Sequence, residues 1–244
     1  MNLKIIGTGS SGNCYLLYNN EEVLLLECGV SFKRIKEGIN FDFSKVVGCL
    51  VTHEHGDHNK SIKEVLAAGI KVFASKGTLE ASNAIEHHNS NIILAKNLYQ
   101  IGGFKIIPFD IRHDVKEPLG FLINHSECGT TLFLTDSFYS PYRFNGLNNL
   151  IIEANFCEDI IDAKLKFDRK FLRDRVLKSH LSIQKCIDLL NTNDLTAVNN
   201  IVLIHLSDSN SNETEFQKKV QEATGKNTIV ARNGLEILFN KNPF

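Results

Sequence analysis

The chain has 244 residues, 43% of them hydrophobic and 23% charged, which is enough for one large globular domain with a substantial core. Its 27 basic and 28 acidic side chains leave a formal net charge of −1. This balance excludes the overall positive charge of a dedicated nucleic-acid-binding protein, although not a local basic patch, and we expect a single domain over residues 1–244.

The N-terminal stretch MNLKIIG carries one lysine and a short apolar run that breaks at a glycine. It fits neither a secretory signal nor a membrane span, so we expect a cytoplasmic protein. The cysteines are scattered and form no C-x-x-C pair, which favours buried thiols that pack as small hydrophobic groups over disulfides or a zinc–thiolate site. They are Cys14, Cys28, Cys49, Cys128, Cys157 and Cys186.

The segment GTGSSG at residues 7–12 matches the G-x-G-x-x-G pattern of dinucleotide-binding proteins, and Glu27 follows about 20 residues later, as that pattern requires. The motif also needs a helix that begins at its last glycine, because the pyrophosphate binds at the helix N-terminus. Here CYLLY and VLLLE predict two strands joined by a tight turn, with no room for a crossover helix. We therefore interpret GTGSSG as a loop between strands, in which glycine allows positive φ and a close backbone approach.

In chain order, strands are predicted over residues 3–6, 14–18 and 23–27, followed by a short helix within SFKRIKEGI at 31–39. VVGCLV at 46–51 predicts a buried strand, which leads into the polar loop THEHGDHN and an amphipathic helix, SIKEVLAAG, at 61–69. The order strand, loop, helix suits a functional site on the loop.

A strand at 71–75 (KVFAS) and a helix at 78–88 (TLEASNAIEHH) are predicted next, followed by the β segments NIILA, FKIIPFDI, PLGFLI, TTLFLTD and NLIIEAN. The last third predicts helices near 168–178, 182–191 and 213–223, a buried strand IVLIHL and a closing pair, TIVA and LEILF. These elements together predict an α/β protein with two sheets in layers and flanking helices.

The loop THEHGDHN supplies His53, His55, Asp57 and His58 within a few positions. Imidazole and carboxylate groups are the usual ligands of zinc, manganese and iron. In an extended loop residues i and i+2 face the same way, so His53 and His55 would bind one ion, while Asp57 and His58 would point towards a second. A polar loop that only caps the next helix would need just one such residue.

Further along the chain, three polar residues each end an apolar run: His113 in FDIRHD, Asp136 in LFLTDS and His205 in VLIHLS. Core packing explains them poorly, because burying an unpaired polar group costs free energy.

The pattern H-x-H-x-D-H after a buried strand resembles the metallo-β-lactamase fold family. The resemblance implies an αββα sandwich of two mixed sheets flanked by helices, which holds two divalent metal ions, zinc or manganese. It implies one ion on His53, His55 and His113, a second on Asp57, His58 and His205, and a bridge through Asp136.

The start of the chain is also similar to that family, with an acidic-x-Gly turn at Glu27-Cys28-Gly29 in which the usual residue is aspartate. Among the subgroups, the segments GTGSSGNCYLL, THEHGDH, HDVKEPLGF, LIIEANF, SHLS and IHLSDSN look most like the bacterial YycJ (WalJ-like) group, regarded as DNA exonucleases. This resemblance implies that GTGSSG is the first loop of that group.

The unit His180-Leu181-Ser182 is similar to a phosphate-binding motif in related nucleases of this fold, which implies that His180 and Ser182 contact the substrate. Glu153 ends another apolar strand and would orient His180, as a Glu–His pair does in phosphodiesterases of the same fold. The predicted catalytic residues are His180, Glu153 and Asp57.

The segment 162–180 holds seven basic residues against three aspartates. A salt-bridged helix face is one explanation. Its position beside His180 favours contact with a phosphate backbone instead, through Arg169, Lys170 and Arg173.

These residues predict a dinuclear metal-dependent phosphodiesterase or nuclease, acting on DNA in an exonuclease-like manner, with His180 as the general acid. A nucleic acid or nucleotide would be the substrate, and a homodimer is left open. Three alternatives stay open. A cyclic-nucleotide phosphodiesterase would need a small closed pocket, a glyoxalase II-like thioesterase or lactonase would need no leaving-group acid, and a metal-stabilised binding protein would turn over nothing.

Overall fold

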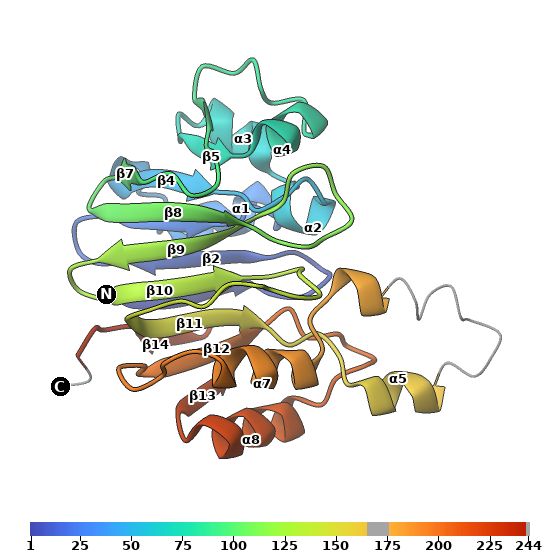
Figure 1. The fold of residues 1–244 in the computed structure, drawn as a ribbon. Coiled ribbons are helices and arrows are strands. Elements are labelled where there is room, and N and C mark those ends of the chain that lie inside the picture. The colour runs from blue at the N-terminus through green and yellow to red at the C-terminus, as the bar shows by residue number, and fades with distance from the viewer. Residues whose placement is uncertain (165–175, 243–244) are drawn as a thin grey trace.

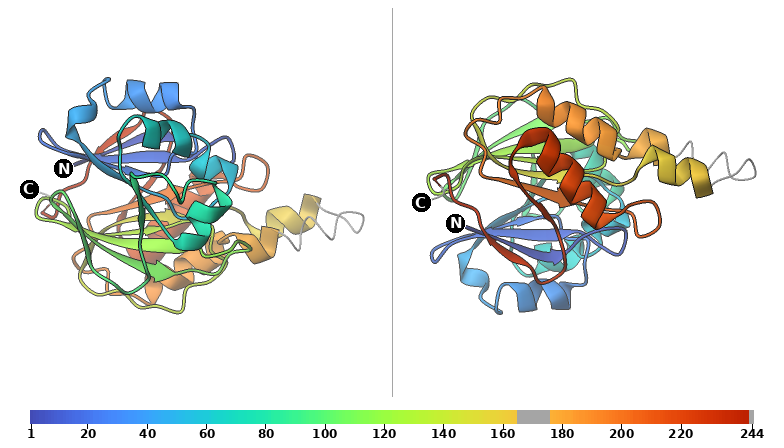
Figure 2. Two further views of the ribbon diagram at one scale, coloured as in Figure 1. Left: turned by 90° about the horizontal axis from the view of Figure 1, so that it is seen from above. Right: turned by 90° about the horizontal axis from the view of Figure 1, so that it is seen from below.

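The computed structural model describes residues 1–164 and 176–242. Within these ranges the chain forms two seven-stranded sheets that pack face to face, with helices on both outer sides (Figure 1). Figure 2 shows the same layers from above and below, with the helices of the N-terminal half on one outer face and the C-terminal helices on the other. The predicted αββα sandwich of two mixed sheets is therefore confirmed.

The first sheet has the strand order β14-β1-β2-β3-β4-β5-β6. β1, β2 and β3 pair antiparallel, which confirms the tight turn predicted after CYLLY, and the strands from β3 to β6 run parallel. Its strands are β1 (Asn2–Gly7), β2 (Cys14–Tyr18), β3 (Val23–Leu26), β4 (Val46–Leu50), β5 (Val72–Ala74), β6 (Ser90–Ile92) and β14 (Glu236–Leu238).

The second sheet has the order β13-β12-β11-β10-β9-β8-β7. The strands from β7 to β10 form an antiparallel meander, and the strands from β10 to β13 run parallel. Its strands are β7 (Tyr99–Ile101), β8 (Phe104–Asp110), β9 (Leu119–His125), β10 (Gly129–Leu134), β11 (Leu147–Glu153), β12 (Asn200–Ile204) and β13 (Asn227–Val230).

Three apolar layers hold the sandwich together. Alternate side chains of each strand point to opposite faces, so Leu24 of β3 packs between the sheets while Leu25 packs under the N-terminal helices. In the same way Ile151 of β11 faces the interior and Ile152 packs under the C-terminal helices. The helices are α1 (Phe32–Gly38), α2 (Gly56–Asn59), α3 (Ile62–Ala67), α4 (Lys76–Ala81), α5 (Glu158–Lys164), α7 (Ile183–Asn191) and α8 (Glu213–Thr224), with a 3-10 turn η1 (Phe43–Lys45).

The carboxyl ends of four parallel strands carry the polar residues singled out in the sequence. His53 follows β4, Asp136 follows β10, Glu153 ends β11 and His205 follows β12. The arrowheads of β10 and β11 point away from the end of the molecule where the N and C labels lie (Figure 1). A site at the carboxyl ends of parallel strands is typical of α/β sheets, because loops there bring distant residues together.

Several predicted elements differ from the observed ones. The helix expected over 78–88 ends at Ala81, because Asn83 adopts a left-handed φ of 51° and the chain turns. The loop THEHGDHN contains the short helix α2, which sequence periodicity did not reveal. TIVA and LEILF do not pair with each other, since β13 and β14 lie at the edges of different sheets. The helix predicted near 168–178 falls largely outside the described residues.

Within residues 1–164 and 176–242, no helix combines the length and the apolar character needed to cross a bilayer. All six cysteines are buried and unpaired, as predicted.

Candidate metal centre

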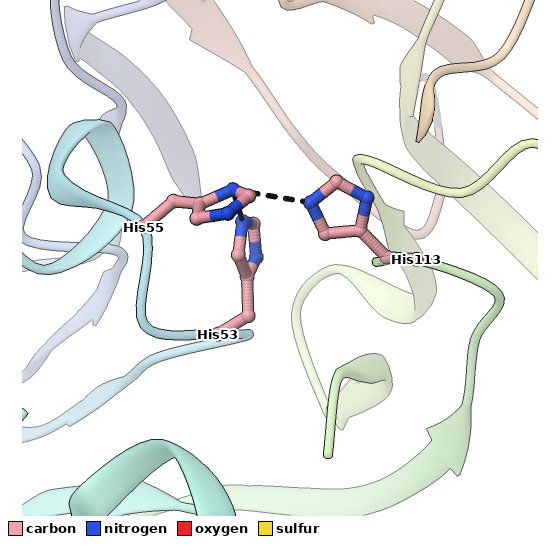
Figure 3. A group of neighbouring side chains, drawn as sticks. All are labelled: His53, His55 and His113. Carbon is pink, nitrogen blue, oxygen red and sulfur yellow. Dashed lines mark hydrogen bonds between the residues drawn. The ribbon is translucent and has the colours of Figure 1, made fainter. Parts of the chain in front are cut away.

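Three imidazoles from two loops form the first cluster: His53 and His55 lie on the loop after β4, and His113 reaches them from the loop after β8 (Figure 3). Nδ1 of His55 lies 3.2 Å from Nε2 of His53 and 3.2 Å from Nε2 of His113. Burial, followed by the neighbouring His58, holds the pKa of His53 well below its usual value, and burial also lowers the pKa of His113. The rings of His53 and His113 are therefore neutral near pH 7 and have lone pairs to donate.

The protonated nitrogen of His53 can be deduced from its neighbours. The Thr52 hydroxyl donates its proton to Oε1 of Glu27 over 2.5 Å. The hydroxyl oxygen of Thr52 also lies 2.9 Å from Nδ1 of His53, and because its own proton is already used, it accepts a hydrogen bond from that nitrogen. Nδ1 of His53 then carries the proton, and Nε2 presents its lone pair to the cluster. A hydrogen bond of this kind fixes the tautomer and orientation of a metal-binding histidine.

A second cluster lies beside the first, and in it the pKa values of the histidines are raised instead of lowered. Oδ2 of Asp57 is 3.1 Å from Nε2 of His205 and 3.3 Å from Nε2 of His58. Burial opposes a positive charge on these rings, but Asp136 and the other surrounding carboxylates outweigh it: the pKa of His58 lies well above its usual value, and that of His205 rises to about 9. Burial alone would raise the pKa of Asp57, and the two histidines instead lower it.

Asp136 lies between the two clusters and is 1% exposed. Its Oδ2 is 2.7 Å from Nε2 of His58, its Oδ1 is 2.8 Å from Nδ1 of His180, and one of its oxygens falls within 4.8 Å of ligand atoms of both His53 and His58. Its backbone adopts a left-handed φ of 49°, which is uncommon for aspartate and is typical of residues held in place at functional sites.

The donor set fits divalent metal ions. Convergent imidazole nitrogens and carboxylate oxygens are the ligands that zinc and manganese take in proteins. Within the described part of the chain, Nδ1 of His113 is buried without a hydrogen-bond partner, while its Nε2 faces His55. Within the described residues four groups are clustered in this way: His53, His55 and His113; Asp57, His58 and His205; His53, His58 and Asp136; and Asp136, Glu153, His180 and His205.

Glu27, where the resemblance implies aspartate, contacts the loop that carries His53 and His58. It is fully buried, it accepts from Thr52, and its Oε1 lies 3.5 Å from Nδ1 of His58. Burial raises its pKa even though His58 and Thr52 act in the opposite direction. The longer side chain therefore still reaches the ligand-bearing loop.

Two glycines, Gly12 in the first loop and Gly29 after β3, allow the backbone segments around Glu27 to approach closely. A Cβ on Gly29 would lie 1.7 Å from the carbonyl oxygen of Asp57, and one on Gly12 would lie 2.4 Å from the carbonyl oxygen of Gly29. Gly12 also has a φ of 133°, and β2 starts directly after Asn13 with no helix. The interpretation of GTGSSG as a closely packed loop between strands is confirmed, and the dinucleotide motif is excluded.

His180 and Glu153 form a pair at the edge of the second cluster. Nδ1 of His180 lies 2.7 Å from Oε1 of Glu153, whose other oxygen accepts from the backbone N–H of Leu181 at 3.0 Å. Burial opposes protonation of His180, but the carboxylates of Glu153 and Asp136 outweigh it and raise its pKa to about 10. Glu153 is fully buried, so it fixes the ring through Nδ1 and leaves Nε2 for other contacts.

Both clusters and the His180 pair open into one cleft of about 470 Å³. The cleft runs from the first loop at Ser10 to the segment around Ser179 and Asn210. The predicted site residues that line it are His55, Asp57, His113, Asp136, His180 and His205.

Not every predicted site residue reaches this cleft. Ser182 is fully buried, and its hydroxyl caps helix α7 by accepting from the backbone N–H of Lys185 at 3.3 Å, so the structure does not bring it to the cleft. The basic residues predicted to contact phosphate lie outside the described residues: Arg169, Lys170 and Arg173.

Two asparagines that the sequence reasoning did not select support the ligands. Nδ2 of Asn13 lies 3.4 Å from Oδ2 of Asp57 and 3.3 Å from Nε2 of His58. Nδ2 of Asn155 donates to the carbonyl oxygen of His205 at 2.8 Å. Their only signal was position, since Asn13 directly follows the GTGSSG loop and Asn155 is the last residue of the predicted segment NLIIEAN.

The αββα fold and this cluster of histidines and carboxylates at its strand ends together define a metal-dependent hydrolase. More particularly, the chain belongs to the metallo-beta-lactamase superfamily, whose family model matches residues 7–133.

Relatives and solved structures agree with this assignment. The chain is 30% identical over 171 residues to exodeoxyribonuclease YycJ of Bacillus anthracis, a match that covers 64% of this chain and only 63% of that protein. It is 28% identical over 224 residues to exodeoxyribonuclease WalJ of Streptococcus pneumoniae strain D39, covering 85% and 82% of the two chains. The metallo-beta-lactamase fold protein YhfI of Bacillus subtilis superposes with a TM-score of 0.75 at 15% identity, covering 96% of this chain and 98% of its own.

Proposed function

We propose that this protein is a dinuclear metal-dependent phosphodiesterase that hydrolyses DNA in an exonuclease-like manner. The observation that carries the proposal is the His180–Glu153 pair, because His180 lines the same cleft as residues of both clusters of metal-ligand type. A hydrolase that expels a sugar oxygen needs a proton donor at the leaving group, whereas a thioesterase does not.

Two ions are proposed because two of the ligand groups, the three histidines and the group that contains Asp57, share no residue. The first cluster is built from three histidines, the second contains Asp57, and Asp136 approaches both. Bound divalent ions supply Lewis acidity, which lowers the pKa of water and withdraws charge from a phosphodiester. Zinc and manganese both suit a mixed set of nitrogen and oxygen donors.

The side chains of the chain itself perform the remaining tasks. Glu153 accepts from Nδ1 of His180, so the proton for the departing oxygen is held at Nε2. Because Glu153 is fully buried and its second oxygen is occupied by Leu181, the ring is held in one orientation. An acid that is positioned in advance needs no reorganisation during the reaction.

DNA is proposed as the substrate because the two relatives described above are named exodeoxyribonucleases. The basic segment 162–180 supports the same proposal from sequence, since clustered lysine and arginine residues bind phosphate backbones.

A substrate panel tests the proposal. The metal-loaded protein is assayed with zinc and with manganese on 5′-phosphorylated single-stranded DNA, on RNA, on a cyclic mononucleotide and on a thioester. We expect the highest kcat/KM on the DNA strand. A preference for the cyclic nucleotide or the thioester would replace the proposal with the corresponding alternative, and no turnover of any substrate would favour a binding protein.

A further inference from the structure

A second cleft, of about 340 Å³, lies next to the metal centre and plays no part in the chemistry described above. The loop after β10 and helix α7 form it. The same two chain segments line both clefts, since Asp136 and His180 face the first one and Tyr139 and Leu181 the second. Three extended residues span about 10 Å, which is about three phosphate steps of a strand at duplex spacing.

Two tyrosines line this second cleft in different ways. The ring of Tyr142 is held by Phe109 and Phe144, with centroid distances of 5.7 and 6.3 Å. Tyr139 is 55% exposed, and its ring stacks on no other aromatic ring of the described residues. An exposed aromatic face beside a cleft is a platform on which a nucleobase can stack.

Two basic side chains line the same cleft. Nζ of Lys185 lies 5.6 Å from the centroid of the Phe138 ring, a cation–π contact that keeps the ammonium group beside the loop. Among residues 1–164 and 176–242, no carboxylate forms a salt bridge with Lys185 or Arg143, and Asp188 is the one acidic residue of the lining. The lining therefore carries an excess of positive charge that a phosphate would neutralise.

We propose that this tyrosine cleft, formed by Tyr139, Tyr142, Arg143 and Lys185, binds one nucleotide of a single-stranded nucleic acid, within about three phosphates of the phosphodiester that is cleaved. The proposal rests on the proposed function and specifies the substrate as a strand that extends beyond the scissile bond. The base stacks on Tyr139, and the phosphate lies near Lys185 and Arg143. Aromatic and basic groups in one groove are the combination that single-stranded nucleic acid requires.

The test uses Tyr139→Leu, which removes the ring, and Tyr139→Phe, which retains it. Phe41→Leu is the matched control, because Phe41 is 62% exposed and lies between α1 and η1, away from both clefts. Affinity for a fluorescein-labelled oligothymidylate is measured by anisotropy, and kcat/KM is measured for the same strand and for bis(p-nitrophenyl) phosphate. Stacking contributes about 1–3 kcal/mol per base, so Tyr139→Leu should bind the strand about 5- to 150-fold more weakly.

The ratio of kcat/KM for the strand to that for bis(p-nitrophenyl) phosphate should fall with the affinity in Tyr139→Leu, and should stay at the wild-type value in Tyr139→Phe and Phe41→Leu. Lys185→Gln should lower the same ratio and should also weaken its dependence on salt. Wild-type affinity and selectivity in Tyr139→Leu would overturn the proposal, and so would an equal loss in Tyr139→Leu and Phe41→Leu.

The two proposals fail in different ways. If the wild-type protein binds the strand through Tyr139 but hydrolyses no phosphodiester, the proposed function fails and the nucleotide site stands. If it hydrolyses DNA and Tyr139→Leu changes nothing, the nucleotide site fails and the proposed function stands.

Discussion

His180→Ala should separate the chemical step from metal binding. In the structure Nδ1 of His180 is occupied by Glu153 and Asp136 at 2.7 and 2.8 Å, while the ring itself lines the cleft. A general acid contributes about 10²- to 10⁴-fold, or about 3–5 kcal/mol of barrier, so kcat on a DNA strand should fall by that factor. Both metal ions should remain bound.

The structure also sets the size of the effect expected for Glu153→Gln. This variant keeps an acceptor 2.7 Å from Nδ1 but removes the charge. A hydrogen bond to a charged group contributes about 1.5–3 kcal/mol and a neutral one about 0.5–1.5, so about 1–1.5 kcal/mol is lost. Turnover should then fall about 5- to 13-fold, less than in His180→Ala.

The assay compares a DNA strand with bis(p-nitrophenyl) phosphate, whose nitrophenolate leaving group hardly needs a proton. The loss in His180→Ala should shrink on the second substrate. His88→Ala is the control, because His88 is exposed and its ring stacks on His87. The reasoning would be refuted if His180→Ala lost a metal ion, which would make His180 a ligand, or if it hydrolysed DNA at the wild-type rate.

Three further changes test the rest of the site. Asp136→Ala should lose affinity for both ions and show the largest drop in turnover of the ligand variants, as measured by elemental analysis and reaction rates. An active Asp136→Ala protein with its full metal content would contradict a bridging role for Asp136. Gly29→Ala should unfold at lower temperature and bind less metal, because its Cβ would overlap the carbonyl of Asp57, whereas Gly56→Ala meets no atom within 4 Å and should resemble the wild type in thermal unfolding. Reversing the charges of the basic segment should flatten the salt dependence of DNA binding, and an unchanged slope would remove that segment from the interface; the residues to reverse are Arg169, Lys170 and Arg173.

Much of the candidate site could be predicted because polar residues that follow apolar runs are conspicuous in a sequence. His113, Asp136 and His205 stood out in this way, and the strand ends do bring Asp136 and His205 close to the histidine loop. The number of residues between them along the chain does not, however, tell how far apart their side chains lie in space. Only the fold shows that His113 reaches His55 from a separate loop, to within 3.2 Å.

Other features depended on three-dimensional packing that local sequence does not encode. The helix predicted over 78–88 stops at Ala81 because Asn83 turns left-handed, which a helical pattern cannot reveal. In the sequence Ser182 resembled a phosphate contact, yet a serine at this position serves equally well as a helix cap. Because its side chain is fully buried and accepts from the first turn of α7, the structure shows that it is the cap. Asn13 contacts Asp57 because the preceding loop, GTGSSG, packs closely against the chain at Gly29.

Metal stoichiometry measured together with activity tests the central claim most directly. Protein stripped with a chelator is titrated with Mn²⁺ or Zn²⁺ while hydrolysis of a 5′-phosphorylated DNA strand is followed, and elemental analysis counts the ions retained. Activity is predicted to rise until two ions are bound per chain, with the histidine cluster and the aspartate-containing cluster both filled. Full activity with one ion or with only trace metal, or no hydrolysis of the strand at two ions, would contradict a dinuclear phosphodiesterase.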